Sequence, residues 1–138
     1  MEVHLLWVFL AALGAFVFYM AMGFALFALM PGLKVEFKKY PGVYRDEPEM
    51  MKRMPLAMLG IAVSIFALAV LYAHMTPWGA GWMQGGAFGV LIGVFALCVS
   101  AIHNHVNLNI GWALTVQSGI AYFVQWVVVG VALGVIYR

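Results

Sequence analysis

The sequence predicts an all-α, polytopic membrane protein: a bundle of four transmembrane helices with a short interfacial helix before the second span. Hydrophobic residues make up 66% of the chain and charged residues 9%, whereas soluble proteins carry about 25% charged residues. Four apolar runs, each near the length of about 20 residues that a bilayer crossing requires, use most of the 138 residues. We therefore expect a single transmembrane domain over residues 1–138.

The first half of the chain is predicted to hold one span, a charged loop and the interfacial helix. Residues 5–30 carry no charged side chain and end at a Pro-Gly pair, which predicts the first span. Residues 31–55 form the predicted charged loop. Within it, Asp46 followed by Glu49 is typical of a capped helix start, so we expect the interfacial helix at residues 47–54.

Three further apolar runs predict the remaining spans at residues 56–74, 86–102 and 112–137. Pro55 opens or kinks the first of these runs, because proline lacks the N–H group that a helix interior needs. A polar segment, residues 103–109, separates the third span from the fourth. The fourth run is longer than a crossing requires, so we expect it to tilt or to begin at the membrane interface.

The distribution of basic residues predicts the orientation. Six of the seven Lys and Arg residues fall within residues 31–55, and only Arg138 lies elsewhere. Because basic loops stay on the inner side, we expect residues 31–55 and 103–109 in the cytoplasm and both termini outside. The expected location is the bacterial inner membrane. A net charge of +2 offers no basic surface for nucleic acid, which we exclude as a partner.

Small residues recur at helical spacing in the last two spans. Gly85, Gly89 and Gly93 follow one another every four residues, and Gly130 and Gly134 repeat the spacing in the last span. In a membrane, such stripes let two helix backbones approach closely. We interpret them as packing surfaces. The pattern favours contact with another helix of this chain, and contact with a second copy stays open.

Four polar side chains lie in a part of the last span that must be largely inside the hydrocarbon. They are Gln117, Ser118, Tyr122 and Gln125. An amide that faces lipid would cost several kcal/mol, so we expect these side chains to face the bundle interior. They would then act either as hydrogen-bonding groups between helices or as the lining of a small ligand site.

The polar segment 103–109 contains His103, His105 and Asn107. In an extended or turn conformation, residues two apart point to the same side, and His103 and His105 could then bind one metal ion. Polar residues between spans also cap helix ends and hold loops by hydrogen bonds. A third interpretation is that His103, His105 and Asn107 bind a substrate or handle a proton at the inner mouth of the bundle.

The chain from Gly85 onward resembles a family of small bacterial four-helix membrane proteins of unknown function. The features that carry the resemblance are the glycine-repeat helix, the polar segment with its asparagines and the polar last span. An aspartate often stands in that family where this chain has His or Asn. The resemblance implies the four-helix fold and no catalytic residue.

The predicted function is that of a non-enzymatic membrane protein. No HExxH, GxSxG or phosphate-binding GKS/GKT motif occurs, and the predicted spans hold no Asp, Glu, Lys or Arg. Proton-coupled transporters usually need such intramembrane charges. The leading hypothesis is an accessory or helix-packing subunit of a membrane complex, with lipids, other subunits or a second copy as partners. The alternatives are a binder of a neutral or lipid-like molecule and a His-based metal or redox site; the sequence assigns no cofactor.

Overall fold

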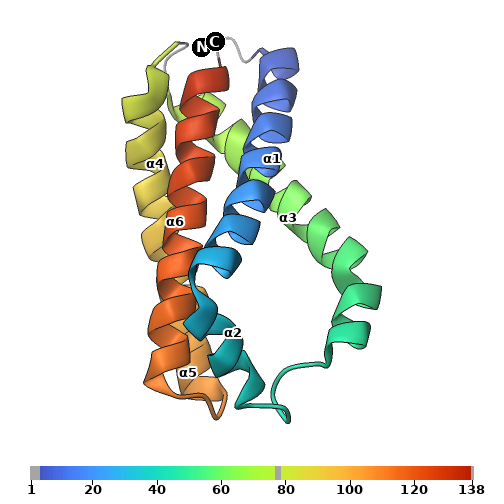
Figure 1. Cartoon of the computed structure of the whole chain (residues 1–138). Helices are drawn as coiled ribbons and strands as arrows, with labels where there is room; N and C mark the ends of the chain where they lie inside the picture. The colour runs from blue at the N-terminus through green and yellow to red at the C-terminus, as the bar shows by residue number, and fades with distance from the viewer. Residues whose placement is uncertain (1–3, 77–78, 138) are drawn as a thin grey trace.

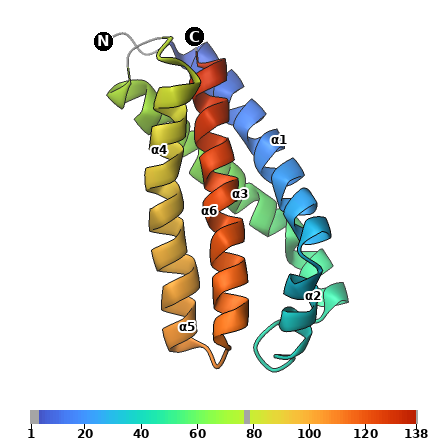
Figure 2. The ribbon, with the colours of Figure 1, turned by 60° about the vertical axis from the view of Figure 1, so that its left-hand side comes forward.

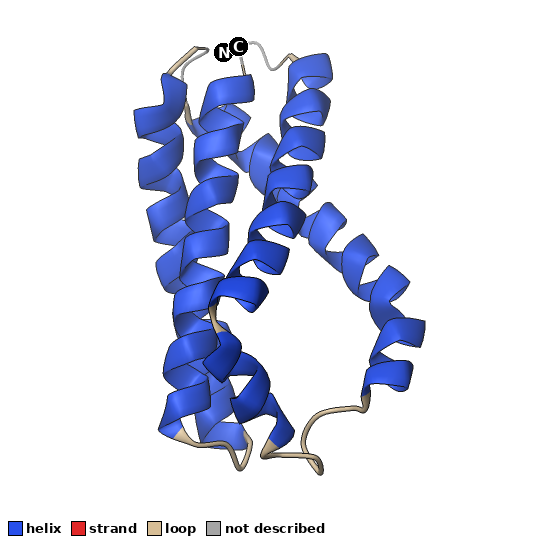
Figure 3. Ribbon diagram, in the orientation of Figure 1, coloured by secondary structure: helices blue, strands red, loops and turns tan. Residues whose placement is uncertain are grey.

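The computed structural model describes residues 4–76 and 79–137, which form a bundle of helices joined by short connections (Figures 1 and 3). Its four long helices are α1 (Leu5–Leu29), α3 (Glu47–Met75), a third that covers Gly81–Asn107, and α6 (Trp112–Ile136). Each is long and apolar enough to cross a membrane, and the described residues contain no strand. The predicted all-α fold class is confirmed, and the chain is an integral membrane protein.

The helices alternate in direction, so the two polar segments share one end of the bundle. α1 begins and α6 ends at one end, whereas α2 and α5 lie at the opposite end (Figure 1). The charged residues 31–55 and the polar residues 103–109 therefore lie on the same side, as four crossings require. Arg138, the remaining basic residue, lies outside the described residues.

The loop prediction for residues 31–55 is wrong in part, because the segment contains a helix, α2 (Pro31–Lys38). Pro31 occupies the first turn of this helix. The N–H groups of a first turn have no partner within the helix, so the missing N–H group of proline costs no hydrogen bond, and its fixed φ angle suits a helix. Leu33 is buried and belongs to a small core with Leu114 of α6. This packing joins the C-terminal end of α1, through α2, to the start of α6.

The interfacial helix predicted at residues 47–54 is not a separate element. α3 continues through Pro55 into the second span. Asp46 takes the N-cap position but forms no side-chain cap bond, so the capping prediction is also wrong. Proline removes the hydrogen bond to the carbonyl group four residues earlier, that of Met51. Met51 is exposed near the charged start of the helix, where water can replace the lost donor.

The third long helix is also longer than the predicted span at residues 86–102. It consists of α4 (Gly81–Ala96), a π-helical segment η1 (Leu97–Ile102) and α5 (His103–Asn107). The extended or turn conformation that the metal hypothesis required is therefore wrong for residues 103–107, which are helical. The side-chain amide of Asn107 donates to the carbonyl oxygen of His103 at 2.8 Å, so this side chain bonds back onto its own helix.

The glycines of α4 face the glycines of α6. A Cβ atom built on Gly85 would lie 2.8 Å from the Cα atom of Gly134, and one built on Gly89 would lie 2.8 Å from the carbonyl oxygen of Val127. Figure 2 shows α4 and α6 side by side along their length. The stripe thus contacts another helix of the same chain, with backbone against backbone.

The main apolar core lies in the half of the bundle where α1 begins and α6 ends. It contains Ala11 and Ala15 of α1, Ile65 and Tyr72 of α3, and Leu133 of α6. No described residue of α3 before Ile65 is buried. α3 crosses the other helices at an angle (Figures 1 and 2), so only its second half packs against them.

Candidate functional site

A partly open cavity of about 150 Å³ lies between α1, α2 and α6. Its polar lining comes from three of the side chains that the sequence singled out, Ser118, Tyr122 and Gln125. Its remaining lining is apolar or glycine: Gly23, Leu26, Phe27, Leu33, Phe37 and Ala121. α2 forms one wall, so the cavity depends on the helix that the sequence did not predict.

The Gln125 amide is the most enclosed polar group of this cavity. Only 8% of the residue is exposed, and its Nε2 atom donates to the carbonyl oxygen of Tyr19 at 3.4 Å. Gly23 of α1 makes room for this amide, because a Cβ atom at that position would lie 2.6 Å from Nε2. The Tyr19 contact uses one of the two amide hydrogens.

The other two polar lining residues keep part of their hydrogen-bonding capacity. The Ser118 hydroxyl donates to the carbonyl oxygen of Thr115, one turn earlier, at 3.2 Å, and its oxygen can still accept. Tyr122 is half-buried. Its phenol lies near that of Tyr44: burial first, and then the neighbouring phenols of Tyr122 and Tyr40, raise the pKa of Tyr44 above the usual value. The Tyr44 ring packs edge-on against Phe37, with centroids 4.7 Å apart.

Gln117 is not part of the cavity lining. It is half-buried, and its Oε1 atom would lie 3.1 Å from a Cβ atom on Gly32. Gln117 therefore covers the junction between α1 and α2. The structure separates it from the three polar side chains that share the cavity.

His103 and His105 do not face one another. Side chains two apart on a helix point about 200° from each other, and His103 is exposed whereas His105 is half-buried. Among the described residues, no group of three His, Cys, Asp or Glu side chains is placed to hold a metal ion. The two imidazoles are therefore not placed to bind the same metal ion.

His105 instead holds the turn between α5 and α6. Its Nδ1 atom lies 2.9 Å from the Thr115 hydroxyl, and the same hydroxyl oxygen lies 3.2 Å from the carbonyl oxygen of Gly111. The hydrogen bond between the imidazole and the hydroxyl joins α5 to the first turn of α6. The ring also lies over Trp112, with centroids 3.8 Å apart.

Tyr40 is a structural residue that the sequence analysis missed. Its hydroxyl oxygen accepts a hydrogen bond of 2.9 Å from the backbone N–H of Gly111, which joins the charged segment to the start of α6. A Cβ atom on Gly111 would lie 2.6 Å from this oxygen. No local pattern reports this contact, because the two residues are far apart in the chain.

Comparison with known proteins found no matching family model, no matching curated protein and no matching solved structure. The family resemblance inferred for residues 85–138 stays a prediction.

Proposed function

We propose that this membrane protein is not an enzyme and that it binds one small neutral molecule in the cavity between α1, α2 and α6. The observation that carries the proposal is the buried Gln125 amide, which borders the cavity together with Ser118 and Tyr122. A buried amide is costly in a membrane unless its hydrogen bonds are made. The contact with Tyr19 is long at 3.4 Å, so a bound polar group would compensate the amide better.

The lining supports a neutral ligand of limited size. No charged side chain is among the described residues that line the cavity, so a charged ligand would be buried without a counter-ion. A cavity of about 150 Å³ accommodates a benzene-sized molecule. The amide and the phenol can each donate and accept. The expected ligand is therefore an apolar body of this size with one hydroxyl, carbonyl or amide group.

Binding of 4-fluorophenol, followed by fluorine NMR on the protein in lipid nanodiscs, tests the proposal. We expect saturable binding to the unsubstituted protein and at least tenfold weaker binding to Gln125→Leu. Gln84→Leu is the matched control, since Gln84 is exposed on α4 and does not line the cavity. Circular dichroism and gel filtration check that both variants fold. Equal affinity for all three proteins, or no saturable binding to any, overturns the proposal.

A second candidate function is that of an accessory subunit of a membrane complex, with α3 as the contacting helix. The first half of α3 has no buried residue before Ile65, and it exposes Met50, Met51 and Met54. Methionine side chains adapt readily to different apolar partners. Native mass spectrometry from gently solubilised membranes tests this candidate. A heteromeric complex or a homo-oligomer supports it, and a bare monomer contradicts it.

We further propose that the protein resides in the bacterial inner membrane with the end that carries α2 and α5 in the cytoplasm. Six of the seven basic residues belong to the segment 31–55 at that end. Basic residues close to the ends of spans remain on the cytoplasmic side. The cavity then lies towards the cytoplasmic half of the membrane, because α2 forms part of its wall.

A further inference from the structure

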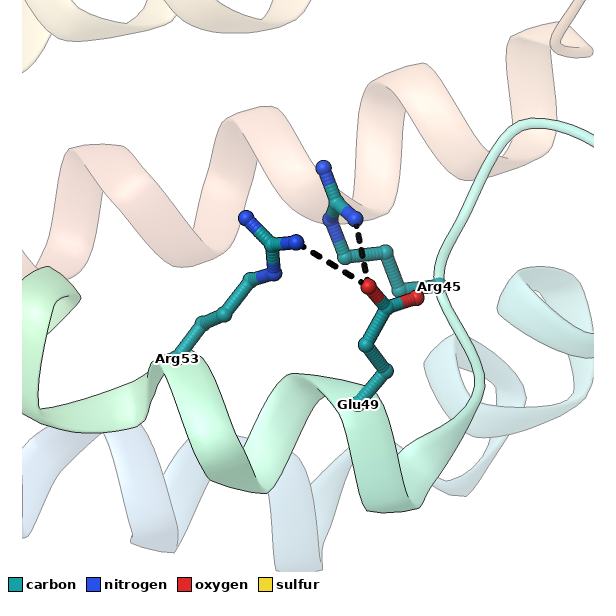
Figure 4. A network of polar contacts seen from close by, with 3 residues as sticks. All are labelled: Arg45, Glu49 and Arg53. Carbon is teal, nitrogen blue, oxygen red and sulfur yellow. Dashed lines mark hydrogen bonds and ion pairs between the residues drawn. The ribbon is translucent and has the colours of Figure 1, made fainter.

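Three charged side chains at the start of α3 form a connected network (Figure 4). Glu49 Oε1 accepts from Arg45 at 2.9 Å and from Arg53 at 3.1 Å. The two guanidinium groups flank one carboxylate, and the network keeps a net positive charge. The three side chains are 45–56% exposed, and ion pairs at this exposure contribute little to stability. Stability alone therefore does not account for the arrangement.

The carboxylate holds the two guanidinium groups close together. Because both bonds end on one oxygen atom, at 2.9 and 3.1 Å, the two donor nitrogens lie within about 6 Å of each other. A guanidinium group carries five N–H donors in a planar fork, which matches the oxygens of a phosphate group. Each arginine uses one nitrogen on Glu49 and retains further donors at the surface. The two guanidinium groups thus lie close enough together to contact one phosphate group.

An apolar track leads from this pair into the membrane. Leu56 and Val63 lie on α3 near the side that carries Arg53, and both are exposed, at 70% and 61%. Between them, Gly60 leaves a gap, since nothing lies within 4 Å of a Cβ atom built there. The distance along the helix from Arg53 to Val63 is about 15 Å, or half the thickness of a bilayer core.

The track ends in an apolar groove between α1 and α3. The groove has a volume of about 400 Å³ and is lined by Phe9, Ala12, Leu13, Phe16, Ala62, Val63 and Phe66. Val63 belongs to both the track and the groove. An acyl chain whose phosphate group sits on Arg45 and Arg53 therefore has a continuous apolar surface from the headgroup to mid-membrane.

From this geometry we infer that Arg45, Glu49 and Arg53 bind the phosphate of one anionic phospholipid of the cytoplasmic leaflet. One of its acyl chains follows Leu56 and Gly60 to the groove at Val63. The two guanidinium groups supply charge complementarity to the phosphate, and the apolar surface begins next to Arg53. The assignment to the cytoplasmic leaflet rests on the proposed orientation; the site itself is independent of the ligand proposed for the cavity.

Native mass spectrometry of the protein in nanodiscs that contain phosphatidylglycerol and phosphatidylcholine tests the site. We expect one tightly retained phosphatidylglycerol, and a loss of at least fivefold in its retention in the variant Arg45→Lys with Arg53→Lys. These substitutions keep the charge but remove the planar fork. The control variant, Lys34→Gln with Lys38→Gln, lowers the charge of the same end and is expected to change retention less than twofold.

Several outcomes would overturn the inference. Equal retention of the two lipids shows that no anionic headgroup is selected. Unchanged retention in the double arginine-to-lysine variant, or a larger loss in the double lysine variant, indicates diffuse attraction to a basic surface. Inorganic phosphate added at the lipid concentration is expected not to displace the lipid. Full displacement would contradict the role of the acyl track. Loss of cavity binding in Gln125→Leu leaves these measurements unaffected, so the two proposals fail separately.

Discussion

Gly85 of α4 and Gly134 of α6 meet with their backbones in contact: a Cβ atom on Gly85 would lie 2.8 Å from both the N and the Cα atoms of Gly134. Helices in lipid gain nothing from apolar burial as such, so their association depends on this close approach. The contact joins the two helices of the last hairpin, and α6 in turn carries the polar side of the cavity. The contact thus holds α4 against the helix that carries the polar side of the cavity.

Gly85→Ala is expected to destabilise the protein by more than about 2 kcal/mol, because the obstacle is backbone and cannot move aside as a side chain can. Gly60→Ala is the matched control. Nothing lies within 4 Å of its Cβ position, and alanine favours a helix over glycine by about 0.5–1 kcal/mol. Reversible unfolding in mixed detergent micelles measures both. Equal stability of the two variants would contradict the backbone contact.

Gly23→Ala is expected to leave the fold intact and to weaken cavity binding at least tenfold. The new Cβ atom would lie 2.6 Å from Nε2 of Gln125, which can swing aside but then loses its contact with the Tyr19 carbonyl. Titration with 4-fluorophenol measures the affinity. Gly86→Ala is the control, since its nearest obstacle is a Val131 methyl group at an ordinary 3.6 Å. An unchanged affinity in Gly23→Ala would count against the amide as the ligand-binding group.

Thr115→Val is expected to destabilise the protein by about 1–2 kcal/mol, because it removes the buried hydroxyl that is hydrogen-bonded to His105. Thr115→Ser keeps the hydroxyl and is expected to retain most of the stability. Nitrogen NMR of the imidazole should show a shifted Nδ1 resonance in Thr115→Val and little change in Thr115→Ser. An unchanged Nδ1 resonance in Thr115→Val, or equal stability of the two variants, would disprove the hydrogen bond.

Tyr44 gives the stability of the end of the bundle that carries α2 and α5 a dependence on alkaline pH. Burial, Tyr122 and Tyr40 raise its pKa above the usual value of 10.0, so the folded state holds this proton more tightly than the unfolded state. The resulting contribution is fully present below pH 10.0 and is lost as the pH rises through the folded-state pKa. Melting temperatures of the protein and of Tyr44→Phe, compared across this range, measure the effect. The decrease should be shallower in Tyr44→Phe, and identical profiles would refute it.

Cysteine labelling decides the orientation. In a Cys98→Ser background, which removes the only native cysteine, Lys38→Cys reports on the charged end and Trp82→Cys on the opposite end; both positions are exposed. A membrane-impermeant maleimide added to intact cells should label Trp82→Cys, and Lys38→Cys only after permeabilisation. The reverse pattern would invert the proposed topology.

Predictions that depend on composition alone agree best with the structure. The first span, predicted at residues 5–30, is α1 (Leu5–Leu29), and the last, predicted at 112–137, is α6 (Trp112–Ile136). A bilayer demands that every backbone polar group be bonded within its helix. A long apolar run is therefore predicted to be a helix whatever other helices it packs against. The burial of Gln125 follows from the same cost of exposing an amide to hydrocarbon.

Predictions at the polar ends of the spans agree less well. Polar residues are compatible with a helix, a turn or an extended segment when water is near, and packing then selects among them. Leu33 lies in a short charged stretch, yet its burial against the start of α6 accompanies a helix there. His105 lies in a polar stretch that resembles a loop, and its bond to Thr115 joins the end of α5 to α6.

The sequence by itself determined that lipid surrounds this protein, that four apolar helices cross it, and that the two polar segments lie at the same end of the bundle. It could do so because the free energy of transfer into lipid is a property of each segment alone. The tertiary structure decided which polar groups share a cavity. Gln125, Ser118 and Tyr122 meet Gly23 and Phe37 only through the packing of α1 and α2 on α6. Contacts between distant segments depend on shape and distance, which periodicity along one helix does not encode.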